Sequence, residues 1–86
     1  MATRTVTYKQ LERALERLGF MQTFRSGNHV TFVQQETGAT ILLPGAQPED
    51  GVQPIYLYTA RRTIVENGIA DEETFESMLN EALEQP

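Results

Sequence analysis

The single histidine of the chain lies in a short polar segment whose residue types suit acid–base chemistry. His29 ends the run Arg25-Ser26-Gly27-Asn28-His29, so one imidazole follows a guanidinium, a hydroxyl and an amide. An imidazole has an ordinary pKa of about 6.5 and can give or take a proton near neutral pH. It supplies only one half of an acid–base pair, however. From these residues alone, a solvated surface histidine is the favoured interpretation.

The composition excludes several other kinds of chemical site. The 86 residues contain no cysteine, which excludes disulfides, thiolate metal sites and cysteine nucleophiles. One histidine cannot form a multi-histidine metal site. The sequence also lacks a glycine-rich phosphate loop, a serine-hydrolase elbow and a carboxylate cluster with metal-ligand spacing. We therefore expect neither a metal ion nor a cofactor.

Charge is distributed unevenly along the chain, whose formal net charge is −5. Residues 1–65 contain all 7 basic residues and 5 acidic ones, a net charge of +2. Residues 66–86 contain 7 acidic residues and no basic one, a net charge of −7. Net charge therefore does not exclude RNA as a partner, but the acidic segment should weaken its long-range attraction and make binding more salt-sensitive.

Apolar residues at helical spacing predict three helices, over about 8–18, 55–66 and 71–83. Thr7 and Gln10 form a capping-box pair before the first helix, and Gly19 is suited to end it. Asp71 is the expected N-cap of the third helix. The side chains expected on the buried stripe of the second helix are Leu57, Ala60, Ile64 and Val65.

Short runs rich in Phe, Val, Thr and Ile predict three antiparallel strands, over about 20–25, 29–34 and 39–43. Turn-forming residues at 26–28 and 36–38 separate them. Side chains alternate along a strand, so Val30 and Phe32 share one face and His29 lies on the other. If the first two face the helices, His29 points outward.

The predicted element order, α-β-β-β-α-α, defines an α+β fold with a three-stranded antiparallel sheet and helices on one face. We expect a single domain over residues 1–86. The connection over 44–54 is longer than most loops, which is often a sign of function. No apolar run approaches the ~18 residues that span a bilayer. We therefore expect a cytoplasmic protein with no membrane partner.

A series of short motifs follows the same order over about residues 5–80. The motifs are Leu18-Gly19-Phe20, Arg25-Ser26-Gly27-Asn28-His29 with Val30-Thr31-Phe32, Ile41-Leu42-Leu43-Pro44, Ile64-Val65-Glu66-Asn67-Gly68-Ile69, and Asp71-Glu72-Glu73 before Phe75. In this order and spacing they resemble the HicA family of toxins. The resemblance implies a fold similar to the double-stranded RNA-binding domain (dsRBD). It also implies endoribonuclease activity on messenger RNA and inhibition by a HicB-like antitoxin protein.

The resemblance also assigns roles to residues. The essential histidine of the family lies in a Gly-Ser-His motif, which here reads Gly27-Asn28-His29. His29 would be the catalytic acid or base of a metal-independent cleavage, and Gly27 would let the backbone approach the substrate. The residues expected to contact RNA are Lys9, Arg13, Arg17, Arg25, Gly27, Asn28 and Arg61. Contacts to phosphate position an RNA without reading its sequence.

Two other interpretations remain open. In the first, the same fold is a catalytically inactive protein-interaction module in which His29 is structural. In the second, the helix over 71–83 docks on a partner or a second copy through its apolar stripe. The side chains of that stripe are Phe75, Met78, Leu79 and Ala82, and burial in the core of this chain is the favoured interpretation for them.

Overall fold

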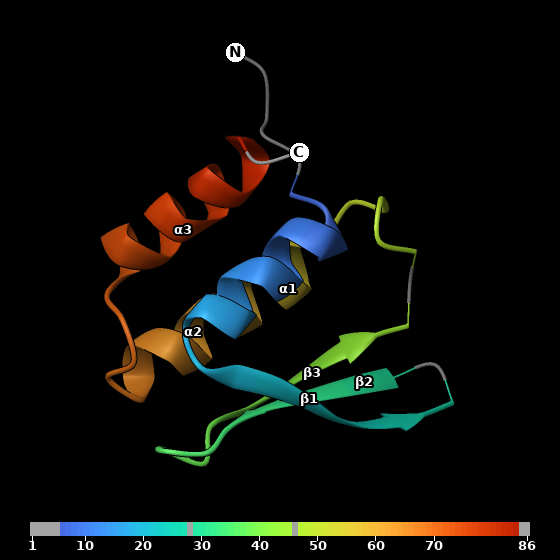
Figure 1. The fold of residues 1–86 in the computed structure, drawn as a ribbon, viewed down its shortest axis with the longest axis horizontal. Coiled ribbons are helices and arrows are strands. Elements are labelled where there is room, and N and C mark those ends of the chain that lie inside the picture. Colours follow the sequence, from blue (N-terminus) through green and yellow to red (C-terminus); the bar gives the residue numbers. More distant parts are fainter. Residues whose placement is uncertain (1–5, 28, 46, 85–86) are drawn as a thin grey trace.

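The computed structural model describes residues 6–27, 29–45 and 47–84 (Figure 1). In chain order, the described elements are α1 (Tyr8–Arg17), β1 (Phe20–Ser26), β2 (His29–Gln34), β3 (Thr40–Pro44), α2 (Pro54–Glu66) and α3 (Glu72–Glu84). The predicted α+β class and element order are confirmed, and each boundary lies within one residue of its predicted position. No described helix has the length and apolar character needed to cross a membrane.

The three strands form one antiparallel sheet in the order β1-β2-β3. At one end of the sheet, His29 of β2 lies opposite Ser26 of β1 and Pro44 of β3. The register of β1 shifts between Gln22 and Phe24, which is typical of a β-bulge. The first residue of the central strand therefore has a strand neighbour on each side.

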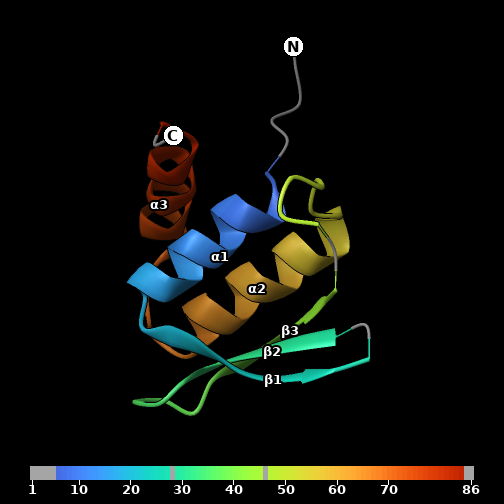
Figure 2. The ribbon, with the colours of Figure 1, turned by 45° about the vertical axis from the view of Figure 1, so that its right-hand side comes forward.

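The three described helices lie on the same side of the sheet (Figures 1 and 2). α1 packs against β1 and α2 against β3, while α3 packs against α1 and α2. Val30 and Phe32 of the central strand are buried, and His29 is exposed. The predicted orientation of this strand is confirmed, because His29 belongs to the face that the helices leave open.

The core between the sheet and the helices takes large side chains from every element. The largest fully buried side chains are Leu11, Leu15, Phe20, Phe32, Ile41, Leu43, Ile64, Phe75 and Leu79. Met78 packs at the edge of this cluster, and the side chain of Ala82 lies outside the described part of the structure. Because Phe75 and Leu79 are fully buried, the apolar stripe of α3 belongs to the core of this chain.

The helix α2 differs from its prediction, because it carries apolar side chains on two faces. Ala60 and Ile64 are buried as predicted, but Val65 is 42% exposed, so the prediction that it is buried is wrong. Ile55 and Tyr58, which are 60% and 51% exposed, lie on the same side of the helix as Val65. α2 thus buries one apolar face and presents a second to solvent.

The predicted helix caps are present. The Thr7 hydroxyl accepts a hydrogen bond from the Gln10 amide at 3.3 Å, and the Gln10 side-chain oxygen accepts one from the Thr7 amide at 2.8 Å. Asp71 Oδ1 accepts a hydrogen bond from the Thr74 amide at 2.7 Å. Gly19, just after α1, has a φ of +93°, which favours glycine. Both ends of α1 and the start of α3 are therefore fixed by local interactions.

Backbone hydrogen bonds join the loop before α2 to the start of α1. The amide of Tyr8 donates to the carbonyl of Asp50 at 3.0 Å, and the amide of Lys9 donates to the carbonyl of Pro48 at 3.0 Å. The first amides of a helix have no partner within the helix itself. The loop satisfies two of them, so its position depends on α1.

Candidate functional site

His29 lies at an open end of the sheet. Gly27, in the turn between β1 and β2, has a φ of +56°, a left-handed conformation that favours glycine. Among the described residues other than its chain neighbours, no heavy atom lies within 4 Å of the position that a Cβ would take on this glycine. Apart from its two chain neighbours, the turn is therefore open around Gly27, two positions before His29.

Two other predicted site residues in this segment are described only in part or not at all. The backbone of Arg25 pairs with that of Val30 in the β1–β2 ladder. The side chain of Arg25 lies outside the described part of the structure, and so does the whole of Asn28. Their predicted contacts with RNA remain predictions.

The open face of the sheet beside His29 carries uncharged side chains. By strand register and exposure, this face includes the described side chains of Met21, Thr31, Val33, Thr40, Leu42 and Pro44. Met21 and Leu42 are 58% and 53% exposed. Positive charge for a phosphate next to His29 must therefore come from residues at the end of the sheet or from another face.

The predicted basic ridge of α1 is present but lies on a different face from His29. Lys9, Arg13 and Arg17 are spaced by four residues, which places them along one side of the helix, away from the buried Leu11 and Leu15. α1 covers the side of the sheet opposite to the face that carries the imidazole. The structure therefore does not gather the ridge and the imidazole on one face.

One end of the basic ridge lies toward the same end of the molecule as His29. The loop that follows Pro44 of β3 is joined to the amide of Lys9 through the carbonyl of Pro48, and Pro44 lies opposite His29 in the sheet. Figures 1 and 2 show the β1–β2 turn, this loop and the start of α1 at the same end. Arg17 lies at the other end of α1, next to the start of β1. Lys9 is therefore the residue of the ridge that lies at the end with His29.

Two predicted RNA contacts are ion-paired with α3. Arg17 Nη1 lies 2.6 Å from Glu81 Oε1. Arg61 Nη1 lies 3.6 Å from Glu76 Oε2 and 3.8 Å from Glu72 Oε1. Within the described part of the chain, Lys9 and Arg13 form no such ion pair. The structure thus divides the predicted cations into an ion-paired set, Arg17 and Arg61, and an unpaired set, Lys9 and Arg13.

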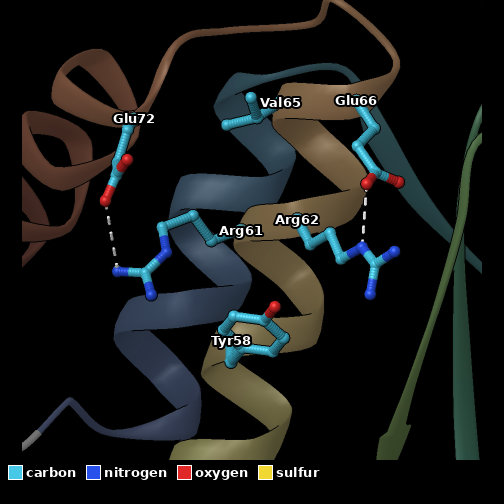
Figure 3. Close-up of a pocket in the computed structure, with 6 residues that line it drawn as sticks. All are labelled: Tyr58, Arg61, Arg62, Val65, Glu66 and Glu72. Carbon is cyan, nitrogen blue, oxygen red and sulfur yellow. Dashed lines mark hydrogen bonds and ion pairs between the residues drawn. The ribbon is translucent and has the colours of Figure 1, made fainter.

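A hollow of about 440 Å³ on α2 is a feature that sequence analysis did not predict (Figure 3). Its lining residues are Tyr58, Arg61, Arg62, Val65, Glu66 and Glu72. Arg61 Cζ lies 6.0 Å from the centroid of the Tyr58 ring, and Arg62 Nε donates to Glu66 Oε2 at 2.8 Å. The sequence of α2 contains more apolar residues than one helix face can hold, and this excess indicates a second, exposed apolar surface.

Among the described residues, no group of three or more histidine or carboxylate side chains is placed to hold a metal ion. Comparisons of the chain with known protein families, curated proteins and solved structures find no match. The fold and the candidate site thus define a small α+β protein with one exposed imidazole and two sets of cations.

Proposed function

We propose that this protein is a HicA-like endoribonuclease toxin that cleaves messenger RNA without a metal ion and uses His29 for proton transfer. The observation that carries the proposal is the exposed imidazole beside the accessible turn at Gly27. The α-β-β-β-α order that the resemblance implies supports it further. The proposed partners are RNA and a HicB-like antitoxin protein, and the proposed location is the cytoplasm, where messenger RNA is translated.

The proposed cleavage is an internal transesterification. The ribose 2′-oxygen attacks the adjacent phosphorus, the bond from phosphorus to the 5′-oxygen breaks, and a 2′,3′-cyclic phosphate and a 5′-hydroxyl result. One proton leaves the 2′-hydroxyl and one reaches the 5′-oxygen. His29 carries out one of these transfers and water the other. Cations stabilise the charge on the phosphorane, and Lys9 and Arg25 are the proposed source.

The test compares the wild-type protein with His29→Ala and with the control Thr40→Ala. Thr40 is exposed on the same sheet, at the end far from His29. Removal of its hydroxyl should therefore leave the surroundings of His29 intact. Expression of the wild type and of Thr40→Ala should arrest growth and degrade messenger RNA. His29→Ala should lower the rate of cleavage by about 10²- to 10⁴-fold, the usual contribution of a positioned acid or base.

The assay also follows the products. Purified wild-type protein with a labelled RNA should yield fragments with 2′,3′-cyclic phosphate ends, and circular dichroism should show the same fold in all three proteins. Equal cleavage by the wild type and by His29→Ala would refute the proposed role of the imidazole.

A second candidate function is a protein-interaction module without catalysis. The exposed apolar side chains of the open sheet face and of α2 favour it, because clustered apolar surface often marks a protein interface. The most exposed of them are Met21, Leu42, Ile55 and Tyr58. This function predicts that the wild type neither cleaves RNA nor arrests growth, so the same assay separates the two.

A further inference from the structure

The helix α3 holds its carboxylates in fixed positions beside α1 and α2. Residues 71–84 contain six acidic residues and no basic one. The same helix buries Phe75 and Leu79 completely in the core. Because these two side chains fix the helix, the neighbouring carboxylates stay next to the basic residues of α1 and α2.

These carboxylates contact two cations from different helices. Glu81 pairs with Arg17 near the end of α1 at 2.6 Å, and Glu76 and Glu72 pair with Arg61 of α2 at 3.6 and 3.8 Å. The Arg17 and Glu81 side chains are 49% and 50% exposed, so water and ions reach the pair. An exposed ion pair is weak, and another anion such as a phosphate can compete for the guanidinium.

We infer that α3 is an internal competitor for RNA phosphates, in which Glu81 occupies Arg17 and the pair Glu72 and Glu76 occupies Arg61. A phosphate that binds either arginine must displace a carboxylate, whereas a phosphate that binds Lys9 or Arg13 displaces none from the described residues. RNA is therefore directed along α1 toward the end of the molecule that carries His29. This inference rests on the proposed function and adds to it the residues that determine where RNA binds.

The chain supplies a matched control for the test. Glu81→Gln and Glu73→Gln each remove one negative charge from an exposed position of α3. Among the described residues, Glu73 has no ion-pair partner, and Glu81 has Arg17. Glutamine is a good helix former, so both variants should keep the fold. A general effect of net charge would be the same in both variants, and local competition would appear only in Glu81→Gln.

The experiment measures the affinity of a fluorescein-labelled single-stranded RNA over a range of KCl concentrations. All proteins carry His29→Ala, so the RNA is not cut. Glu81→Gln should bind about two- to five-fold more tightly than Glu73→Gln at low salt, as expected for the loss of an exposed competing pair. The slope of log affinity against log salt should also steepen by about 0.7, the value for one more phosphate contact on a single strand.

Addition of Arg17→Gln completes the cycle. With Arg17→Gln in both proteins, Glu81→Gln should bind RNA no more tightly than Glu73→Gln, because the Arg17 guanidinium that Glu81→Gln releases is then absent. The double variant Glu72→Gln with Glu76→Gln should increase affinity in the same way through Arg61, and Arg61→Gln should cancel that increase.

The outcomes separate this inference from the proposed function. Equal affinities of Glu81→Gln and Glu73→Gln in folded proteins would overturn the inference, and cleavage of RNA by the wild type would still support the ribonuclease. If Glu81→Gln still binds RNA more tightly than Glu73→Gln after Arg17→Gln is added to both, the inference is also overturned. If no variant binds RNA at the lowest salt concentration, the inference and the proposed function both fail.

Discussion

At the scale of single residues, His29 is distinguished by its residue type and Gln34 by its burial. His29 is the only imidazole in the sequence, so the chain supplies at most one half of a histidine acid–base pair. Gln34 is the buried polar side chain of the described core. Its Nε2 donates to the carbonyl of Leu18 at 2.6 Å, and its Oε1 accepts from the Thr37 hydroxyl at 2.7 Å. Gln34 therefore joins the end of α1 to the turn between β2 and β3.

Gln34→Leu should lower the free energy of unfolding by about 1–3 kcal/mol, because the Leu18 carbonyl and the Thr37 hydroxyl each lose a hydrogen-bond partner. Urea denaturation followed by circular dichroism measures the change. The matched control is Gln35→Leu, at the neighbouring exposed position, which should stay within about 0.5 kcal/mol of the wild type. Equal losses in the two variants would contradict the role of the Gln34 hydrogen bonds.

At the scale of elements, the helices differ in what fixes them. α1 has a capping box and one buried face, so its bounds follow from residues close together in the chain. α2 begins at Pro54 without a side-chain cap and has apolar residues on two faces. Asp71 caps the start of α3, and its Oδ1 accepts a hydrogen bond from the Thr74 amide. The hydrogen bonds from the Thr74 side chain and backbone lower the pKa of Asp71 below its ordinary value of 3.8.

This shift predicts a dependence of stability on pH. Because the pKa of Asp71 is lower in the folded chain, the ionised carboxylate stabilises the fold above the pKa of the unfolded chain. That contribution is lost as the pH falls through the folded pKa. Asp71→Asn keeps a capping side chain but has no proton to gain.

The urea midpoints of the wild type and Asp71→Asn should therefore converge as the pH falls from 7 to below the ordinary carboxyl value of 3.8. Circular dichroism at several pH values measures the difference. A difference that is constant over the whole range would show that the charge of Asp71 does not stabilise α3.

At the scale of the whole molecule, α3 is part of the core and not an appended acidic segment. It packs against α1 and α2, and Phe75 and Leu79 are among the fully buried side chains. Removal of the helix would therefore expose the core as well as change the charge. For this reason, the effect of its charge on RNA binding is best measured with single substitutions on its surface.

Phe75→Ala should lower the free energy of unfolding by about 3–5 kcal/mol, the usual cost of a large cavity in a core. Met21→Ala, at a side chain that is 58% exposed, is the control and should have little effect. Sheet and helices should unfold in a single transition in urea, measured together by circular dichroism and tyrosine fluorescence. The three tyrosines lie in α1 and α2, so a loss of helical signal well before the change in tyrosine fluorescence would show that α3 unfolds independently.

The sequence by itself determined the features that depend on neighbours in the chain. The capping residues Thr7 and Asp71, the turn glycines and the two faces of β2 were all predicted from short-range pattern, and the structure has them. These interactions join residues within a few positions of each other. Short-range pattern therefore yields the elements, their order and the exposure of His29.

Only the tertiary structure decided which surfaces are covered and which charges are paired. In α2, periodicity did not distinguish the exposed Val65 from the partly buried Leu57, because apolar residues occur around most of the helix. Arg17 and Glu81 are 64 positions apart in the chain. They meet because the burial of apolar side chains places α3 against α1, and no local pattern encodes that contact.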